Sequence, residues 1–213
     1  RDEQTFSTDQ DNGIVFACAD EAAVDGLRQR FLAFALEVNK DLDRCGFPLC
    51  KGNIMASNPQ WCLTLEEWKN QFSKWVRSPE PDALLNASIF FDFRALFGNA
   101  ELAEQMRHFL LTATGGNSLF LQSMARNALS VAPPLGTIRD FITDLEPGNP
   151  GKIDLKKYGS RIFVDVARIY ALATGVHNTN SVQRLRIASK RLAIRDEEVN
   201  AVLEGLDFIQ LLR

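Results

Sequence analysis

The 213-residue sequence contains only two histidines, four cysteines and no long apolar run. His108 and His177 are far apart in the sequence, so a histidine-based catalytic triad is not expected. No segment approaches the roughly 18–20 apolar residues that span a bilayer, and no basic-then-apolar signal pattern opens the sequence. A net charge of −3 argues against a binder of nucleic acid or anionic membranes. We therefore expect a cytoplasmic protein without a membrane span.

The cysteines contain no CxxC pair, and a chain of this length does not depend on a disulfide scaffold. The spacing of Cys45, Cys50 and Cys62 fits no standard zinc site, so we expect buried free thiols. Charge is distributed unevenly, with −5 over residues 1–97 and +4 over residues 152–213. The acidic part suits a carboxylate metal site, and the basic part suits phosphates or simply solvated helix faces.

Apolar residues predict a small α/β unit in the first part of the chain. GIVFA at 13–17 and ASIFFDFR at 87–94 are typical of short buried strands. Helical spacing over residues 21–42 predicts a long amphipathic helix, and Thr64 with Glu67 forms a capping box that predicts a second one. Three tryptophans in and before this second helix are expected to pack in the core rather than to stack on a base.

After residue 97 the pattern is helical throughout. Helical periodicity recurs over residues 99–112, 117–131, 136–144, 161–174, 181–192 and 196–211, with Gly, Pro or Asn between the segments. We therefore expect an α+β fold, with a small α/β domain over residues 1–97 and an α-helical bundle domain over residues 98–213.

Asp9 and Asp11 stand two residues apart at the entrance to the first predicted strand. Side chains two apart in extended chain point to the same face, so these carboxylates converge. Converging carboxylates repel each other unless a cation lies between them, and Mg²⁺ prefers such oxygen ligands. A D-x-D pair is common in loops, but here it leads directly from a polar segment into an apolar strand.

Asp92 lies inside the apolar ASIFFDFR segment, where an unpaired carboxylate would cost several kcal/mol. Two interpretations remain open for it. In the functional one, Asp92 is the third metal ligand or the base for an incoming hydroxyl. In the structural one, it is an acid that pairs with nearby Arg94.

The segments EQTFSTDQDN, GFPLCKGNIMASNPQWCLTLEEW and ASIFFDFR together resemble a nucleotidyltransferase family of bacterial signalling proteins. Its catalytic domain is similar to that of the PII uridylyltransferase, in the polymerase-beta-like superfamily. Family members often follow cyclic-nucleotide-binding and CBS domains in longer chains. PPLGTIRDF, GKIDLKKYGSRIFVDVARIYALATG and RLRIA resemble the helical C-terminal domain of the family, which is described as substrate-binding.

The resemblance implies that Asp9, Asp11 and Asp92 are catalytic metal ligands for Mg²⁺, with ATP or UTP as co-substrate. Arg1 and Gln4 match the end of a signature that opens with a Gly-Ser pair and binds the nucleotide. That pair would lie just before Arg1, so the predicted α/β domain is expected to lack the turn that cradles the phosphates.

Other polar residues of the matching segments have two interpretations each. Lys51 and Asn58 border the nucleotide, or they belong to a turn that the neighbouring prolines shape. Several basic residues of the helical part contact phosphates or an acceptor protein, or they form surface salt bridges. These residues are Lys156, Arg161, Arg168 and Arg184.

The function predicted from the sequence is Mg²⁺-dependent transfer of a nucleotidyl group from ATP or UTP to a hydroxyl, most simply on a signalling protein. A second hypothesis is a non-catalytic module for nucleotide sensing or protein interaction in bacterial signal transduction. Nucleotidylation of a small molecule, as in aminoglycoside-modifying enzymes, shares the chemistry and differs only in the acceptor.

Overall fold

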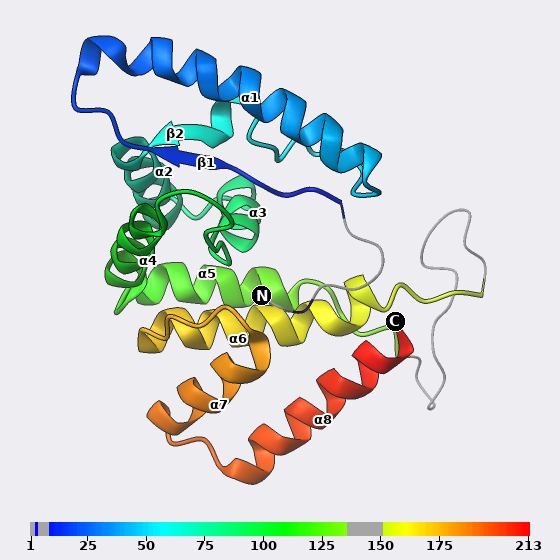
Figure 1. Cartoon of the computed structure of the whole chain (residues 1–213). Helices are drawn as coiled ribbons and strands as arrows, with labels where there is room; N and C mark the ends of the chain where they lie inside the picture. Colours follow the sequence, from blue (N-terminus) through cyan, green and yellow to red (C-terminus); the bar gives the residue numbers. More distant parts are fainter. Residues whose placement is uncertain (1–2, 4–8, 136–150) are drawn as a thin grey trace.

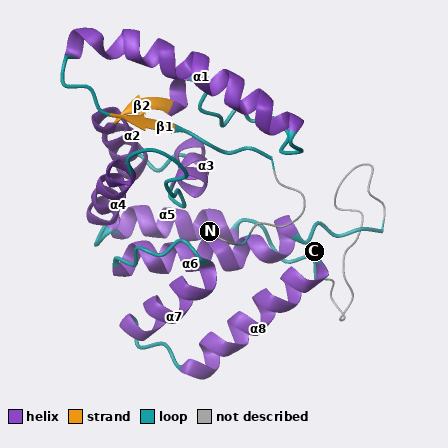
Figure 2. Cartoon of the chain, in the orientation of Figure 1, coloured by secondary structure: helices purple, strands orange, loops and turns teal. Residues whose placement is uncertain are grey.

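The computed structural model describes residues 3, 9–135 and 151–213. The described residues form a mainly helical α+β structure with a two-stranded sheet (Figure 2). In chain order the elements are β1 (Ile14–Phe16), α1 (Val24–Arg44), β2 (Cys62–Thr64), α2 (Leu65–Arg77), α3 (Pro81–Phe90), α4 (Ala100–Thr114), α5 (Ser118–Leu129), α6 (Arg161–Thr174), α7 (Ser181–Arg191) and α8 (Asp196–Leu212), with short helical turns at Glu21–Ala23, Pro59–Trp61 and Lys156–Ser160.

The two strands are parallel, with Ile14 opposite Cys62 and Phe16 opposite Thr64. Parallel strands need a long crossover connection, and α1 provides it. In Figure 1, α1 lies above the strands and α2 lies below them. The predicted capping box is confirmed at the start of α2, because the Thr64 hydroxyl accepts from the N–H of Glu67 while the Glu67 carboxylate accepts from the N–H of Thr64.

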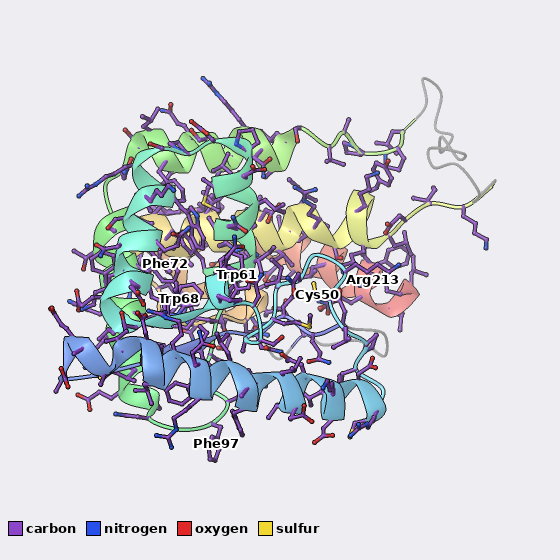
Figure 3. All side chains as sticks on the ribbon, turned by 90° about the horizontal axis from the view of Figure 1, so that it is seen from above. Cys50, Trp61, Trp68, Phe72, Phe97 and Arg213 are labelled. Atoms are coloured by element: carbon purple, nitrogen blue, oxygen red, sulfur yellow. The ribbon has the colours of Figure 1, made fainter. Side chains whose placement is uncertain are left out.

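Aromatic side chains from α2, α3 and the short helical turn Pro59–Trp61 form much of the main core. Trp61, Trp68, Phe72 and Trp75 are almost fully buried, and the ring centroids of Trp61 and Phe90 lie 4.4 Å apart. Figure 3 labels three of these residues, Trp61, Trp68 and Phe72, which lie in the interior to one side of α1. Burying such large rings supplies much of the apolar area on which the fold depends. The prediction that the tryptophans pack in the core is therefore confirmed.

The predicted strand at 87–94 is wrong. Helix α3 continues to Phe90, and a turn follows it. Pro81 occupies the first turn of α3, where a missing N–H costs nothing, and Leu84, Ala87 and Phe91 are buried at helical spacing against α2. The β propensity of the Ile-Phe-Phe run is outweighed by this packing, because strand propensity depends on tertiary context.

The helices predicted after residue 97 are confirmed as α4 to α8, except that the predicted segment 136–144 lies outside the described residues. The amphipathic helix predicted over residues 21–42 is present as α1, but some of its apolar residues do not face the core. Phe34 and Val38 are exposed, whereas Ala35 and the polar Asn39 are buried. Asn39 is thus a polar residue on the buried side of α1, and its contacts explain why it is buried.

The main core continues across the predicted domain boundary at residue 97. It unites Trp68 of α2 with Leu110 of α4, Phe120 of α5 and Leu172 of α6. A smaller cluster around Leu185 joins α6, α7 and α8, which form the lower part of Figure 1. The division into two domains stays a prediction. Within the described part of the chain, no helix combines the length and the apolar character that crossing a membrane requires.

Candidate functional site

The segment from Asp9 to Asn12 leads into β1 in an extended conformation, and its side chains alternate between inside and outside. Gln10 is only 5% exposed, whereas Asp9 and Asp11 on either side of it are exposed. Since extended chain has a period of two, both carboxylates lie on the outer face of this segment. The predicted shared face of Asp9 and Asp11 therefore agrees with the burial pattern.

Buried amide groups hold this segment against α1. The Gln10 amide nitrogen donates to the backbone oxygens of Asn39 and Phe47, both at 2.8 Å. The Asn39 amide nitrogen donates in turn to Gln10 Oε1 at 2.8 Å and to Asn12 Oδ1 at 3.1 Å. Each polar atom needs such a partner because burial removes it from water. We call Gln10, Asn12 and Asn39 the amide network.

Residues 48–56 run beside the same segment. The backbone N–H of Gln10 donates to Pro48 O at 3.0 Å, and that of Asn12 donates to Ile54 O at 3.1 Å. The Cys50 thiol is hydrogen-bonded to Asp11. Burial is the main cause that raises the pKa of Cys50, and the negative charge of Asp11 adds to it. The loop around Cys50, labelled in Figure 3, thus borders the face that carries Asp11.

Among the predicted nucleotide-binding residues, Lys51 is exposed in the turn next to Cys50. Asn58 has both amide atoms engaged within its own turn, because its oxygen accepts from the N–H of Gln60 and its nitrogen donates to Asn53 O. This supports the structural interpretation of Asn58. Arg1 and Gln4 lie outside the described residues, so their nucleotide contacts stay predictions.

Asp92 lies in the turn after α3 and is held by two arginines. Its Oδ1 accepts from Arg184 Nη1 at 2.5 Å, and its Oδ2 accepts from Arg168 Nη2 at 2.7 Å and Nε at 3.2 Å. The side chains of Asp92, Arg168 and Arg184 are 6%, 3% and 2% exposed. Both carboxylate oxygens of Asp92 are therefore committed to guanidinium groups.

A second acid completes this buried cluster. Asp165 accepts from Arg168 Nη1 at 2.5 Å, and its other oxygen lies 3.4 Å from Arg161 Nε. Burial alone would lower the pKa of Arg168, but the charges and hydrogen bonds of Asp92 and Asp165 outweigh it and raise the pKa. We call Asp92, Asp165, Arg168 and Arg184 the ion-pair cluster.

The structure does not bring the three predicted acids together. Within residues 9–135 and 151–213, no three His, Cys, Asp or Glu side chains are grouped so that they could hold a metal ion. Asp92 is not on a strand beside Asp9 and Asp11, and its surroundings do not fit a third metal ligand. Its structural interpretation is supported, although the partners are Arg168 and Arg184 rather than Arg94.

Sequence reasoning missed the amide network and the partners of Asp92. The polar Asn39 on the otherwise apolar side of the predicted helix over residues 21–42 was a signal for the first. Nothing local signalled the second, because Arg168 and Arg184 are 76 and 92 residues away from Asp92. For Arg168 and Arg184 the sequence suggested either contact with phosphates or an acceptor protein, or a surface salt bridge. Both side chains are buried in ion pairs with Asp92, so neither interpretation describes them.

Replacing Asn39 by alanine is expected to loosen the segment that carries Asp9 and Asp11. The variant loses the bonds from its amide to Gln10 and Asn12, and buried polar groups left without partners cost about 1–3 kcal/mol. Chemical denaturation measures this loss, and hydrogen exchange measures the protection of residues 9–12. Asn70→Ala, at an exposed position of α2, is the control. Equal stability and protection in the two variants would contradict the positioning role of Asn39.

Two family models match the chain. A family model described as "Putative nucleotidyltransferase DUF294" matches residues 1–82, and one described as "Putative nucleotidyltransferase substrate binding domain" matches residues 118–213. No curated protein and no solved structure matches the chain. Similarity to the PII uridylyltransferase stays a prediction. Together the two matches cover most of the sequence and include Asp9, Asp11, Arg168 and Arg184, so the chain belongs to the DUF294 family.

Proposed function

We propose that this chain transfers a nucleoside monophosphate group from ATP or UTP to a hydroxyl group, with Asp9 and Asp11 as the Mg²⁺ ligands. The observation that supports the proposal is the outer face of the segment before β1. Two carboxylates share this face, and the amide network fixes the segment from behind. Fixing the backbone in this way prepares both acids before any ligand arrives, which is what precise positioning requires.

The donor set fits Mg²⁺. Magnesium is usually bound through one or two carboxylates, with substrate phosphates and water as its remaining ligands, so two exposed acids on one face suffice. When bound, Mg²⁺ would stabilise negative charge on the phosphates of the nucleotide. Asp9 and Asp11 would hold the cation, and exposed Lys51 in the bordering loop would add a positive charge near the same phosphates.

In the proposed reaction the acceptor oxygen forms a bond to the α-phosphorus. The bond from that phosphorus to the bridging oxygen breaks, pyrophosphate leaves, and the hydroxyl proton passes to solvent. Asp92 has no part in this step, because its carboxylate already neutralises Arg168 and Arg184. As acceptor we propose a protein hydroxyl, and residues 118–213, which match the substrate-binding model, would contact it.

One observation favours a second function, that of a nucleotide-sensing module without catalysis. The third acid expected from the resemblance is engaged in the ion-pair cluster rather than available to substrate. A protein that kept only Asp9 and Asp11 could bind a magnesium–nucleotide complex and report it to a partner. The two functions differ in whether label is transferred.

We expect label to pass from α-³²P-ATP or α-³²P-UTP to a protein band in a cell extract, in the presence of the full-length natural protein and Mg²⁺. Label from γ-³²P-ATP should not pass, because the γ-phosphate leaves with pyrophosphate. EDTA should abolish the α-label transfer. Calorimetry of nucleotide binding with and without Mg²⁺ accompanies the assay. Mg²⁺-dependent binding without transfer would establish the sensing module instead, and the absence of both would refute the two functions together.

A further inference from the structure

A surface pocket of about 280 Å³ is lined by the turn after α3, the helix α4, and the connection from α6 to α7. Its polar lining includes Arg94, Glu104, Arg107, His177 and Gln183. Gly175 ends α6 in a left-handed conformation, with φ of 69°, and so turns the chain into this connection. The lining contains neither Asp9 nor Asp11, and the residues from 93 to 107 lie between the two family matches.

Arg107 is the most unusual residue of the pocket, because its charge is buried without an ion pair to any carboxylate of the described residues. Its side chain donates to the backbone oxygen of Phe91 at 3.0 Å and to that of Phe93, and its guanidinium carbon lies 4.0 Å from the centroid of the Phe93 ring. These partners are neutral, and Arg107 is only 6% exposed. Within the described part of the chain, Arg107 forms no ion pair with a carboxylate.

The contrast with the neighbouring ion-pair cluster is informative. Arg168 and Arg184 are equally buried, but each pairs with Asp92. Burial, followed by repulsion from Arg184, lowers the pKa of Arg107 to about 10, although Asp92 and Glu104 act in the opposite direction. Burying a charge without a counter-charge is costly, and an incoming anion would remove that cost.

A second arginine faces the same pocket. Arg94 is exposed, and it too has no ion pair among the described residues. Two guanidinium groups match a phosphate, which carries up to two charges and several acceptor oxygens. The rest of the lining offers groups that could hydrogen-bond hydroxyls on the other part of a phosphate-bearing molecule. These groups are the Glu104 carboxylate and the amides of Asn178 and Gln183, in which Asn178 Nδ2 donates to Gln183 Oε1 at 2.7 Å.

We propose that this pocket binds a small phosphate-bearing molecule, with Arg94 and Arg107 contacting the phosphate. The phosphate belongs either to an intact nucleotide or to free pyrophosphate or phosphate. The proposal does not depend on the proposed nucleotidyl transfer, because the pocket contains none of the residues assigned to that reaction. A site of this kind would give the protein a second position at which phosphate compounds bind.

Isothermal titration calorimetry of the 213-residue chain tests the proposal, with inorganic phosphate, pyrophosphate and ATP as probes. EDTA is present throughout, so that Mg²⁺-dependent binding at Asp9 and Asp11 does not contribute. We expect binding that weakens as salt is raised, and a loss of affinity of about tenfold or more in Arg107→Gln and in Arg94→Gln, the scale of one charge-assisted hydrogen bond. Arg126→Gln, at an exposed arginine of α5, is the matched control.

Glu104→Gln supplies a test with the opposite sign. Removing this negative charge from the lining should strengthen binding of the same probe. If the pocket residues had only a structural role, Glu104→Gln would not strengthen binding. If ATP binds but pyrophosphate and phosphate do not, the ligand is an intact nucleotide. If pyrophosphate binds as tightly as ATP, the pocket recognises the phosphate group and not the nucleoside. If Arg107→Gln does not fold, the variants Arg94→Gln and Glu104→Gln, at exposed positions, still test the proposal. Lack of binding by all three probes, or wild-type affinity in Arg94→Gln, would overturn the proposal.

Discussion

Asp11→Asn is expected to abolish nucleotidyl transfer while the fold remains intact. The amide keeps the size of the side chain and one coordinating oxygen, but it removes the charge that holds a hard cation. Losing several kcal/mol of charge stabilisation means a rate about a thousandfold lower, because each ~1.4 kcal/mol is a factor of ten. The measurement is transfer of α-³²P label by the full-length natural protein, compared with wild type at equal concentration.

Thermal melts separate loss of the metal from loss of the fold in this variant. Without Mg²⁺, Asp11→Asn should melt at or slightly above the temperature of wild type, since one of two neighbouring like charges is gone. The stabilisation that Mg²⁺ with nucleotide gives to wild type should be missing. Asp43→Asn, at an exposed position of α1, controls for a change of net charge. Transfer by Asp11→Asn at the wild-type rate would refute the metal-binding role.

Asp92→Asn is expected to lower the free energy of unfolding by about 3–5 kcal/mol, because it leaves Arg168 and Arg184 buried without their common carboxylate. The variant keeps the shape of the side chain, so the loss reports charge rather than packing. Urea denaturation monitored by tryptophan fluorescence measures it. An exposed acid on α8 provides the control, and Asp207→Asn should change stability by no more than about 0.5 kcal/mol.

The result for Asp92 also distinguishes its two interpretations. If Asp92 served only as a metal ligand, Asp92→Asn would lower activity without lowering stability. If Asp92 belongs to the ion-pair cluster, the same variant should lower the free energy of unfolding. If Asp92→Asn does not fold, Asp92→Glu keeps the charge and should recover part of the stability. A loss below about 1 kcal/mol in Asp92→Asn would contradict the structural role.

The ion-pair cluster connects the two parts of the chain that match the family models. Asp92 lies between the matched segments, and its partners lie on α6 and α7, within residues 118–213 that match the second family model. The main hydrophobic core crosses the same junction, from Trp68 of α2 to Leu172 of α6. Movement between the parts would break both sets of contacts, so we infer that they act as one packed unit.

Much of the fold could be read from local sequence. The helices after residue 97 follow the spacing of their apolar residues, because a helix that packs on one side must repeat its apolar positions every three or four residues. The capping box at Thr64 was equally readable, since it consists of neighbouring residues. The shared face of Asp9 and Asp11 follows from the period of extended chain.

What the sequence alone could not determine depended on contacts between distant residues. The run around Phe90 has strand propensity, yet packing against α2 makes it the end of a helix, because burial of aromatic rings outweighs local preference. The partners of Asp92 come from α6 and α7, whereas Arg107 forms no ion pair within the described residues because of which side chains the fold brings near it. Local patterns thus determined the helices and the face of the two acids, whereas tertiary packing decided which charges are paired, since pairing depends on distance in space rather than in sequence.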